Sequence, residues 1–115
     1  MSNDNIGYDF EVPFTVEFDI QSISNPSNFR FRAYQQDSSN SNSFVYDLSS
    51  LGISDTNYHH VCVQLVSNNI TCLVDDIKVK DLSRNITDKL KVNFTTINTG
   101  ASSNVKNMII YSDNV

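Results

Sequence analysis

Tryptophan is absent from this chain of 115 residues, and cysteine, proline and glycine occur only two, two and three times. Two cysteines are too few for a disulfide scaffold. Lysine and arginine number eight against thirteen acidic residues, and the net charge of −5 argues against a surface for nucleic acid or anionic membranes. No apolar run reaches the roughly 18 residues of a membrane-spanning helix. The first residues also lack the basic and apolar regions of a signal peptide.

What the chain does contain is enough for one domain. Hydrophobic residues make up 39%, with seven phenylalanines and five tyrosines, which suffices for one core in a chain of this length. With so little glycine and proline, asparagine, aspartate and serine have to form most of the turns. We therefore expect residues 1–115 to form a single domain, which belongs to a longer protein.

Short segments in which apolar and polar residues alternate predict half-buried strands. The clearest is FTVEFDI (14–20), whose apolar side chains alternate with Thr15, Glu17 and Asp19. No segment keeps the period of a helix, and alternation with one polar face is typical of antiparallel sheets. The sequence therefore predicts an all-β fold, an antiparallel β-sandwich. The other expected strands are 29–34, 44–48, both sides of Asn68-Asn69, 77–80, 90–97 and 107–111.

The segment YHHVCVQLVSNNITCLVDDIKV (58–79) reads as a hairpin if Asn68-Asn69 is its two-residue turn. In that register Leu65 faces Cys72, which places Cys72 on the inner face of the sheet and Cys62 on the outer face. A disulfide does not reach through a sheet, so we expect two thiols, with Cys72 in the core. The predicted core consists of Val16, Phe18, Phe31, Val61, Val63, Cys72, Val74, Val92, Met108 and Ile110.

The same segment raises the question of a metal site, because it holds adjacent histidines and adjacent aspartates. A zinc site needs three or four converging ligands. His59 and His60 point to opposite faces of a strand, and only Cys62 shares the face of His60. We therefore expect structural histidines and no metal. A hairpin turn explains Asp75-Asp76, and Ca²⁺, which takes six to eight oxygen ligands, remains the weaker alternative there.

Residues 58–76 show a further pattern: an aromatic residue, two histidines, a short Val-Cys-Val strand, a turn, and a strand that ends in Leu-Val-Asp-Asp. This pattern resembles the laminin-G-like and pentraxin-like branch of the concanavalin A-like lectin and glucanase superfamily. Tyr58 stands where the family has Trp, and Asp76 where it has Gly. PFTVEFDI (13–20) is similar to the early strand of the family, and VKNMIIYSDN (105–114) to the last one.

This resemblance implies a jelly-roll sandwich of the concanavalin A-like type. It also implies a binding role, towards glycans, matrix proteins or cell surfaces, as one module of a large extracellular, cell-surface or virion protein. Other domains of the parent chain would then be its neighbours. We expect no cofactor.

Some relatives within this superfamily are glycoside hydrolases, which usually carry two glutamates in an alternating motif on one strand. The glutamates of this chain, Glu11 and Glu17, lie six residues apart and form no such motif. Glu17 and Asp19 are the only local pair of carboxylates on one strand face. The sequence also shows no nucleophile–base pair and no glycine-rich phosphate loop. We therefore expect no enzymatic activity, and a hydrolase fragment is the weaker alternative.

Sugar binding needs aromatic faces and hydrogen-bonding side chains on one surface. Three long side chains of residues 29–34 alternate with apolar ones and project from one face, roughly 6.6 Å apart. The loop 35–43 is rich in amides and hydroxyls, and binding residues gather on such loops. We predict a shallow glycan-binding surface with residues Arg30, Arg32, Tyr34, Tyr46 and Asp47.

Two alternatives to this binding surface remain open. Arg30 and Arg32 could simply solubilise a sheet face and form ion pairs with Glu17 or Asp19. The domain as a whole could be a structural or oligomerising spacer of an adhesin or tail fibre, which the absence of tryptophan favours. If these residues form a glycan-binding surface, Tyr34→Ala abolishes glycan binding with little change in melting temperature, because the ring is expected to be exposed.

Overall fold

The computed structural model describes residues 5–24, 29–34, 44–86, 89–96 and 102–112. This part of the chain is all-β, as predicted. None of its helical segments has the length and apolar character needed to cross a bilayer. Its elements are β1 (Asn5–Phe10), β2 (Phe14–Ser24), β3 (Phe29–Tyr34), β4 (Phe44–Asp47), the 3-10 turn η3 (Ser49–Leu51), β5 (Tyr58–Val66), β6 (Asn69–Val74), β7 (Ile77–Ser83), β8 (Leu90–Thr96) and β9 (Ser102–Ser112).

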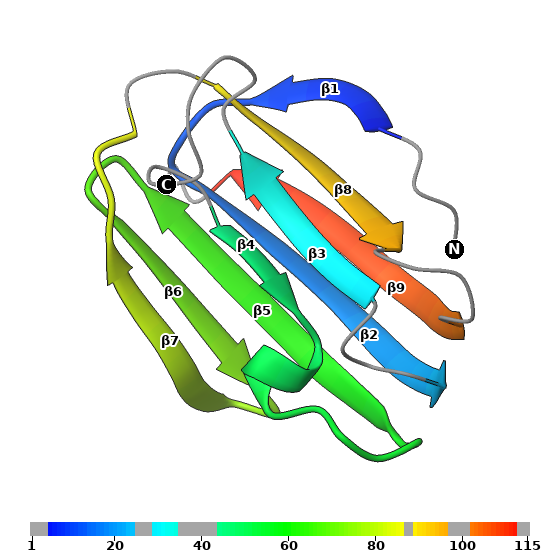
Figure 1. Ribbon diagram of the computed structural model, residues 1–115. Helices are drawn as coiled ribbons and strands as arrows, with labels where there is room; N and C mark the ends of the chain where they lie inside the picture. Colours follow the sequence, from blue (N-terminus) through cyan, green and yellow to red (C-terminus); the bar gives the residue numbers. More distant parts are fainter. Residues whose placement is uncertain (1–4, 25–28, 35–43, 87–88, 97–101, 113–115) are drawn as a thin grey trace.

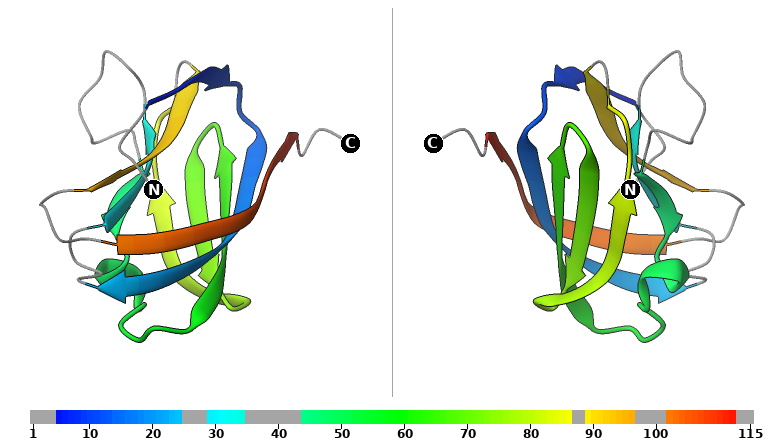
Figure 2. Two further views of the ribbon diagram at one scale, coloured as in Figure 1. Left: turned by 90° about the vertical axis from the view of Figure 1, so that its right-hand side faces the viewer. Right: turned by 90° about the vertical axis from the view of Figure 1, so that its left-hand side faces the viewer.

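The strands form two antiparallel sheets, which confirms the predicted sandwich. One sheet has four strands in the order β1-β8-β3-β4, and the other has five in the order β7-β6-β5-β2-β9. In the view of Figure 1 the four-stranded sheet covers the five-stranded one, and Figure 2 shows the two layers from their edges. β1 was not predicted, and β2 and β9 are longer than expected.

The core lies between the two sheets. Phe18 of β2 and Phe31 of β3 are fully buried, and their ring centroids lie 5.1 Å apart, so they join one sheet to the other. Phe44 of β4 extends this contact, with its ring centroid 6.0 Å from that of Phe31. The predicted core is confirmed: Val16, Phe18, Phe31, Val61, Val63, Cys72, Val74 and Val92 are buried, and Met108 and Ile110 are partly buried against them.

The turn of the β5-β6 hairpin differs from the prediction. Ser67-Asn68 forms it, and Leu65 pairs with Ile70 instead of Cys72, so the predicted register was wrong. The carbonyl oxygens of Ser67 and Asn68 accept hydrogen bonds from the backbone of the segment after β7, which favours this turn. A shift of the partner by two residues leaves every side chain on its predicted face.

The cysteines therefore lie as expected. Cys72 is buried in the core opposite Val63, and Cys62 is half-buried on the outer face of the sheet. No disulfide joins them. Burial raises the pKa of the Cys72 thiol to about 12.

Candidate functional site

Polar side chains gather on the outer face of the five-stranded sheet, where β5, β2 and β9 lie side by side. Asp19 of β2 lies opposite His60 of β5 on one side and opposite Lys106 of β9 on the other. Since alternate residues of a strand share a face, the outward side chains of the three strands form one surface. We call this surface the His60 face, and its residues are Glu17, Asp19, Tyr58, His60, Lys106, Asn107 and Tyr111.

The imidazole of His60 lies between two carboxylates. Its Nδ1 atom is 2.7 Å from Oδ1 of Asp19, and its Nε2 atom is 2.8 Å from Oε1 of Glu17. The second oxygen of each carboxylate accepts a hydrogen bond from β9. The Tyr111 hydroxyl donates to Glu17 Oε2, and the Asn107 amide donates to Asp19 Oδ2 at 2.8 Å. Each of the four carboxylate oxygens therefore has a hydrogen-bonding partner, and the network joins three strands.

The electrostatics of this network favour an ionised state for each acid and base. The hydrogen bonds to Asp19 and Glu17 raise the pKa of His60 above its usual value. The pKa of Glu17 is lowered by the Tyr111 hydroxyl and by His60, and the pKa of Asp19 is lowered by the Asn107 amide and by His60. In return, Glu17 raises the pKa of Tyr111 to about 12. These shifts favour an imidazolium between two carboxylates.

A bulge in β9 supplies one of the donors. The pairing of β2 with β9 changes register between Glu17 and Asp19, where β9 has one extra residue. Asn107 sits in this bulge with φ 57°, a left-handed conformation that asparagine tolerates better than most residues. The bulge turns Asn107 towards Asp19 beside Lys106, while Met108 packs against the core. Bulges re-aim side chains in this way at functional sites.

An exposed tyrosine lies at each end of the network. Tyr111 is opposite Thr15 of β2 and Tyr58 is opposite Gln21, so about 20 Å of strand separates them. The ammonium group of Lys106 lies 4.0 Å from the centre of the Tyr58 ring. The His60 face is therefore a mainly polar strip, with the exposed Ile109 opposite Glu17 and an aromatic ring near each end, which suits an extended ligand that carries hydroxyl groups.

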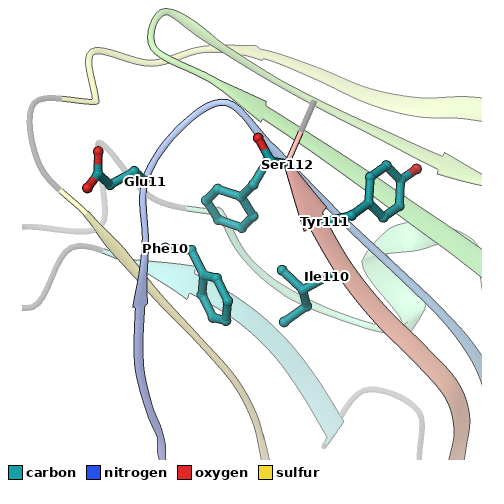
Figure 3. A pocket seen from close by; sticks show the side chains of 6 residues that line it. Phe10, Glu11, Ile110, Tyr111 and Ser112 are labelled. Carbon is teal, nitrogen blue, oxygen red and sulfur yellow. The ribbon is translucent and has the colours of Figure 1, made fainter. Parts of the chain in front are cut away.

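A pocket of about 350 Å³ opens next to Tyr111 and is lined by Phe10, Glu11, Phe14, Ile110, Tyr111 and Ser112. In Figure 3 the side chains of Phe10 and Ile110 turn towards each other, whereas the Tyr111 ring points away from them. Phe10, Phe14 and Ile110 belong to the core or pack against it. The pocket therefore opens on the inner side of β9, and it does not extend the His60 face.

The residues predicted from sequence lie mainly on the opposite side of the sandwich. Arg30, Arg32 and Tyr34 of β3 share the outer face of the four-stranded sheet with Asp47 of β4, which pairs with Arg30. We call this surface the Arg32 face. The guanidinium carbon of Arg32 lies 4.2 Å from the centre of the Tyr34 ring, so one face of that ring is already covered. The loop 35–43 lies outside the described residues.

Asp47 holds the turn that follows β4. Its Oδ1 atom accepts hydrogen bonds from the Ser49 hydroxyl at 2.9 Å and from the Ser50 backbone at 2.8 Å. Burial raises the pKa of Asp47, but the bonds from Ser50 and Ser49 and the charge of Arg30 outweigh it, and the net pKa is lowered. This carboxylate thus has a structural role in addition to any contact with a ligand.

Tyr46 does not join the Arg32 face. It pairs with the buried Phe31 and lies on the inner side of β4, with its ring centroid 4.8 Å from that of Phe44. The ammonium group of Lys80 lies 4.7 Å from its ring. The prediction that Tyr46 lies on the binding surface is wrong, because Tyr46 is two residues from the buried Phe44 and shares its face of the strand. The predicted surface therefore lacks this ring.

The alternative ion pairs of Arg30 and Arg32 with Glu17 or Asp19 do not form either. Those carboxylates belong to the outer face of the other sheet, with the whole core between. Sequence alternation did place Glu17, Asp19 and His60 outward. It gave no signal that Asn107 reaches Asp19 or that Tyr111 reaches Glu17, because these contacts depend on the register and the bulge of β9.

His59 has a similar arrangement at the rim of the sheet. Its ring nitrogens lie 2.7 Å from Asp55 and 2.6 Å from Asp75, and these contacts raise its pKa. Asp75 and Asp76 have φ 52° and 67°, so they form the predicted hairpin turn. Among the described residues, no group of three or more His, Cys, Asp and Glu side chains is arranged to hold a metal ion.

No known protein family and no curated protein matches this sequence. Solved structures with a similar fold include a sialidase, with a TM-score of 0.66 and 13% sequence identity. The match covers 97% of this chain and 14% of the sialidase. A carbohydrate-binding module from Bacillus subtilis has a TM-score of 0.58 and 14% identity, over 87% of this chain and 75% of the module. Sheep galectin-11 in complex with glycerol has a TM-score of 0.52 and 7% identity, over 90% of this chain and 98% of the galectin. The likeness shows the fold, a jelly-roll β-sandwich, as predicted.

Proposed function

We propose that this domain is a non-catalytic carbohydrate-binding module of a larger extracellular, cell-surface or virion protein, and that the glycan lies along the His60 face. The observation that carries the proposal is the polar network of Glu17, Asp19 and His60 between two exposed tyrosine rings. The fold it shares with a carbohydrate-binding module and a galectin supports this function. Among superfamily branches, the laminin-G-like pattern at residues 58–76 is the one we favour.

The chemistry of the face fits sugar hydroxyl groups. Each carboxylate oxygen already accepts one hydrogen bond and has a second lone pair for a hydroxyl donor. The ammonium group of Lys106 donates, and the rings of Tyr58 and Tyr111 offer apolar faces for sugar C–H groups. One stacked ring contributes on the order of 1 kcal/mol, and each hydrogen bond about 1 kcal/mol net. After the cost of association we expect dissociation constants of roughly millimolar to micromolar.

The same carboxylates argue against catalysis. A glycosidase needs one carboxyl group that stays protonated at the working pH, and burial or a like charge usually raises its pKa. Here the pKa values of both Glu17 and Asp19 are lowered by their donors. The domain therefore binds glycans without cleaving them, and turnover of a glycan that Glu17→Gln abolishes would contradict this.

A structural or oligomerising role is the second candidate. Isoleucines are exposed on the five-stranded sheet, Ile109 by 57%, Ile77 by 68% and Ile23 by 48%. Exposed apolar side chains of this kind mark interfaces when they form one patch. Light scattering of the isolated domain separates the two roles, since a spacer self-associates and a binding module stays monomeric.

A matched pair of aspartate variants tests the location of the site. Asp19→Ala removes a carboxylate from the His60 face, and Asp47→Ala removes one from the Arg32 face. Wild type and both variants are applied to a glycan array, and each hit is followed by titration calorimetry. We expect Asp19→Ala to weaken binding at least about tenfold and Asp47→Ala to leave it unchanged. Loss of binding in Asp47→Ala alone would place the glycan on the Arg32 face instead.

A further inference from the structure

His60 occupies the centre of the proposed glycan site, and both of its ring nitrogens face carboxylate oxygens. We propose that a proton on His60 switches glycan binding: the imidazolium holds Glu17 and Asp19 in the arrangement that accepts sugar hydroxyls, and binding is lost when the ring becomes neutral. This inference rests on the proposed function of the His60 face and adds its regulation.

The geometry requires the second ring proton. In the imidazolium both nitrogens donate, which matches the contacts at 2.7 Å to Asp19 and 2.8 Å to Glu17. A neutral imidazole has one N–H group, so one of its nitrogens would turn a lone pair towards a carboxylate oxygen at hydrogen-bond distance. That contact is repulsive, and the carboxylate concerned moves away. Its hydroxyl-accepting oxygens then leave the positions set by Tyr111 or Asn107.

The charges that face His60 from the surrounding strands are mostly negative. β2 contributes Glu17 and Asp19, and the β6-β7 turn contributes Asp75, whose Oδ1 accepts the His60 backbone N–H at 3.0 Å. From β9 come the neutral Tyr111 hydroxyl and the ammonium group of Lys106, which lies over the ring of Tyr58.

On its own strand, His60 has Tyr58 and the Cys62 thiol as the next outward neighbours, and neither places a cation against the ring. Two carboxylates against the imidazole, a third at the backbone N–H of the same residue, and a single nearby ammonium group favour the protonated ring. This agrees with the raised pKa of His60.

The sign of the effect follows from linkage between proton and ligand binding. Below the pKa of His60 in the folded domain the ring is charged, and the affinity is constant with pH. Above that pKa, a ligand that needs the charged ring loses about tenfold in affinity per pH unit. At acidic pH the range in which the glycan binds is limited by Glu17 and Asp19, because protonation of these carboxylates also breaks the network.

Two variants of His60 separate charge from shape. In His60→Arg the side chain stays charged and has planar donors for both carboxylates, so the binding that this variant retains should show no fall between pH 6 and 9. In His60→Gln one donor and the charge are lost, so binding should be weak at every pH. His59→Gln is the matched control: His59 also lies between two carboxylates, Asp55 and Asp75, but at the rim and outside the His60 face.

The experiment has two arms on the intact domain. In the first, NMR follows the imidazole resonances of His59 and His60 from pH 4 to 10 without ligand. In the second, calorimetry measures binding of lactose, maltotriose, cellotriose and kestose at pH 5, 7 and 9, in parallel with the melting temperature. We expect a pKa of His60 above 6.5, a decline in affinity above it for wild type and His59→Gln, and a flat profile for His60→Arg.

The possible results are distinct. If His60 titrates at or below its ordinary pKa of about 6.5, the inference is overturned whatever the sugars do. If a sugar binds on the His60 face with the same affinity at pH 5 and 9, the inference fails and the proposed function stands. If no sugar binds at any pH and a glycan array is also negative, the proposed function fails, and the inference that rests on it fails as well.

Discussion

The two outer faces of the sandwich are built from contacts of very different range along the chain. On the His60 face, the bonds of His60 to Asp19 and Glu17 join residues 41 and 43 positions apart, and the bonds from Asn107 and Tyr111 span 88 and 94 positions. On the Arg32 face, Arg32 covers a ring two residues along its own strand, and Asp47 bonds to residues two and three positions on.

This difference has a consequence for function. Local contacts of the kind seen on the Arg32 face form wherever the strand forms, and they occupy one face of the Tyr34 ring and one oxygen of Asp47. The long-range network exists only when three strands are in register, so the fold itself preorganises it. Preorganised donors and acceptors bind with less ordering cost, which is why we place the ligand on the His60 face.

The largest expected effect comes from the core that both faces share. Phe18 lies between Glu17 and Asp19 in β2, and its buried ring contacts Phe31 beneath the Arg32 face. Phe18→Ala should lower the free energy of unfolding by about 3–5 kcal/mol, measured by urea denaturation. Because a domain of this size has only about 5–15 kcal/mol of stability, the milder Phe18→Leu is made alongside. Glycan binding should fall in step with the folded fraction, and a stable Phe18→Ala domain would contradict the central place of this contact.

A matched pair of tyrosines compares the two faces directly. Tyr111→Ala removes a ring and a donor to Glu17 from the His60 face, and Tyr34→Ala removes the ring that Arg32 covers. We expect Tyr111→Ala to weaken glycan binding by about thirtyfold, the equivalent of a ring contact and one hydrogen bond at about 1 kcal/mol each. Tyr34→Ala should change it by less than about twofold. The sequence alone predicted the reverse for Tyr34, so titration of both variants against one glycan decides between the faces.

The sequence predicted best what depends on neighbours within one strand. Alternation in residues 14–20 placed the apolar side chains of β2 in the core, and it placed Glu17 and Asp19 outside. In the β5-β6 hairpin each side chain also lies on its predicted face although the predicted turn was wrong, because a shift by two residues leaves the face unchanged. The sequence also contained the information that Tyr46 lies on the inner side of β4, because Tyr46 and Phe44 are two residues apart on one strand.

What the sequence did not predict depends on pairing between distant strands. β1 pairs with β8 through an irregular register, and its NIGYDF sequence does not alternate cleanly. Asn107 reaches Asp19 only because β9 is bulged, and a bulge is set by the strand pairing as much as by its own residues. Sequence patterns therefore indicate the outward position of individual site residues, but not which of these residues contact one another.

A smaller effect should appear in the dependence of stability on pH. The pKa values of His59 and His60 are raised by their carboxylate partners, so their contribution is complete below the unfolded value of about 6.5 and is lost as pH rises through the folded pKa. Asp47 on the Arg32 face has a lowered pKa, so its contribution is present above the unfolded pKa and is lost as pH falls through the folded one.

Melting temperatures from pH 3 to 10 test this contrast. His60→Gln and His59→Gln should each lower the melting temperature below pH 6.5 and flatten its fall at alkaline pH. Asp47→Ala should instead reduce the fall in melting temperature at acidic pH. Partly exposed ion pairs contribute up to about 1 kcal/mol, so shifts of a few degrees are expected. An unchanged alkaline fall in both histidine variants would show that neither network contributes.

The smallest perturbation uses the cysteines, which report the two sides of one sheet. Alkylation requires a thiolate, and the buried Cys72 has a pKa of about 12, whereas Cys62 is half-buried on the outer face opposite Glu17. Iodoacetamide should therefore label Cys62 in the native domain and Cys72 only after unfolding in urea, as peptide mass spectrometry will show.

Cys62 is the next outward residue after His60, so a glycan on the His60 face should slow its labelling, while a glycan on the Arg32 face leaves the rate unchanged. Cys62→Ser, which removes the reporter, controls for labelling elsewhere. Equal labelling of both thiols in the native domain would contradict the assignment of faces on which the whole comparison depends.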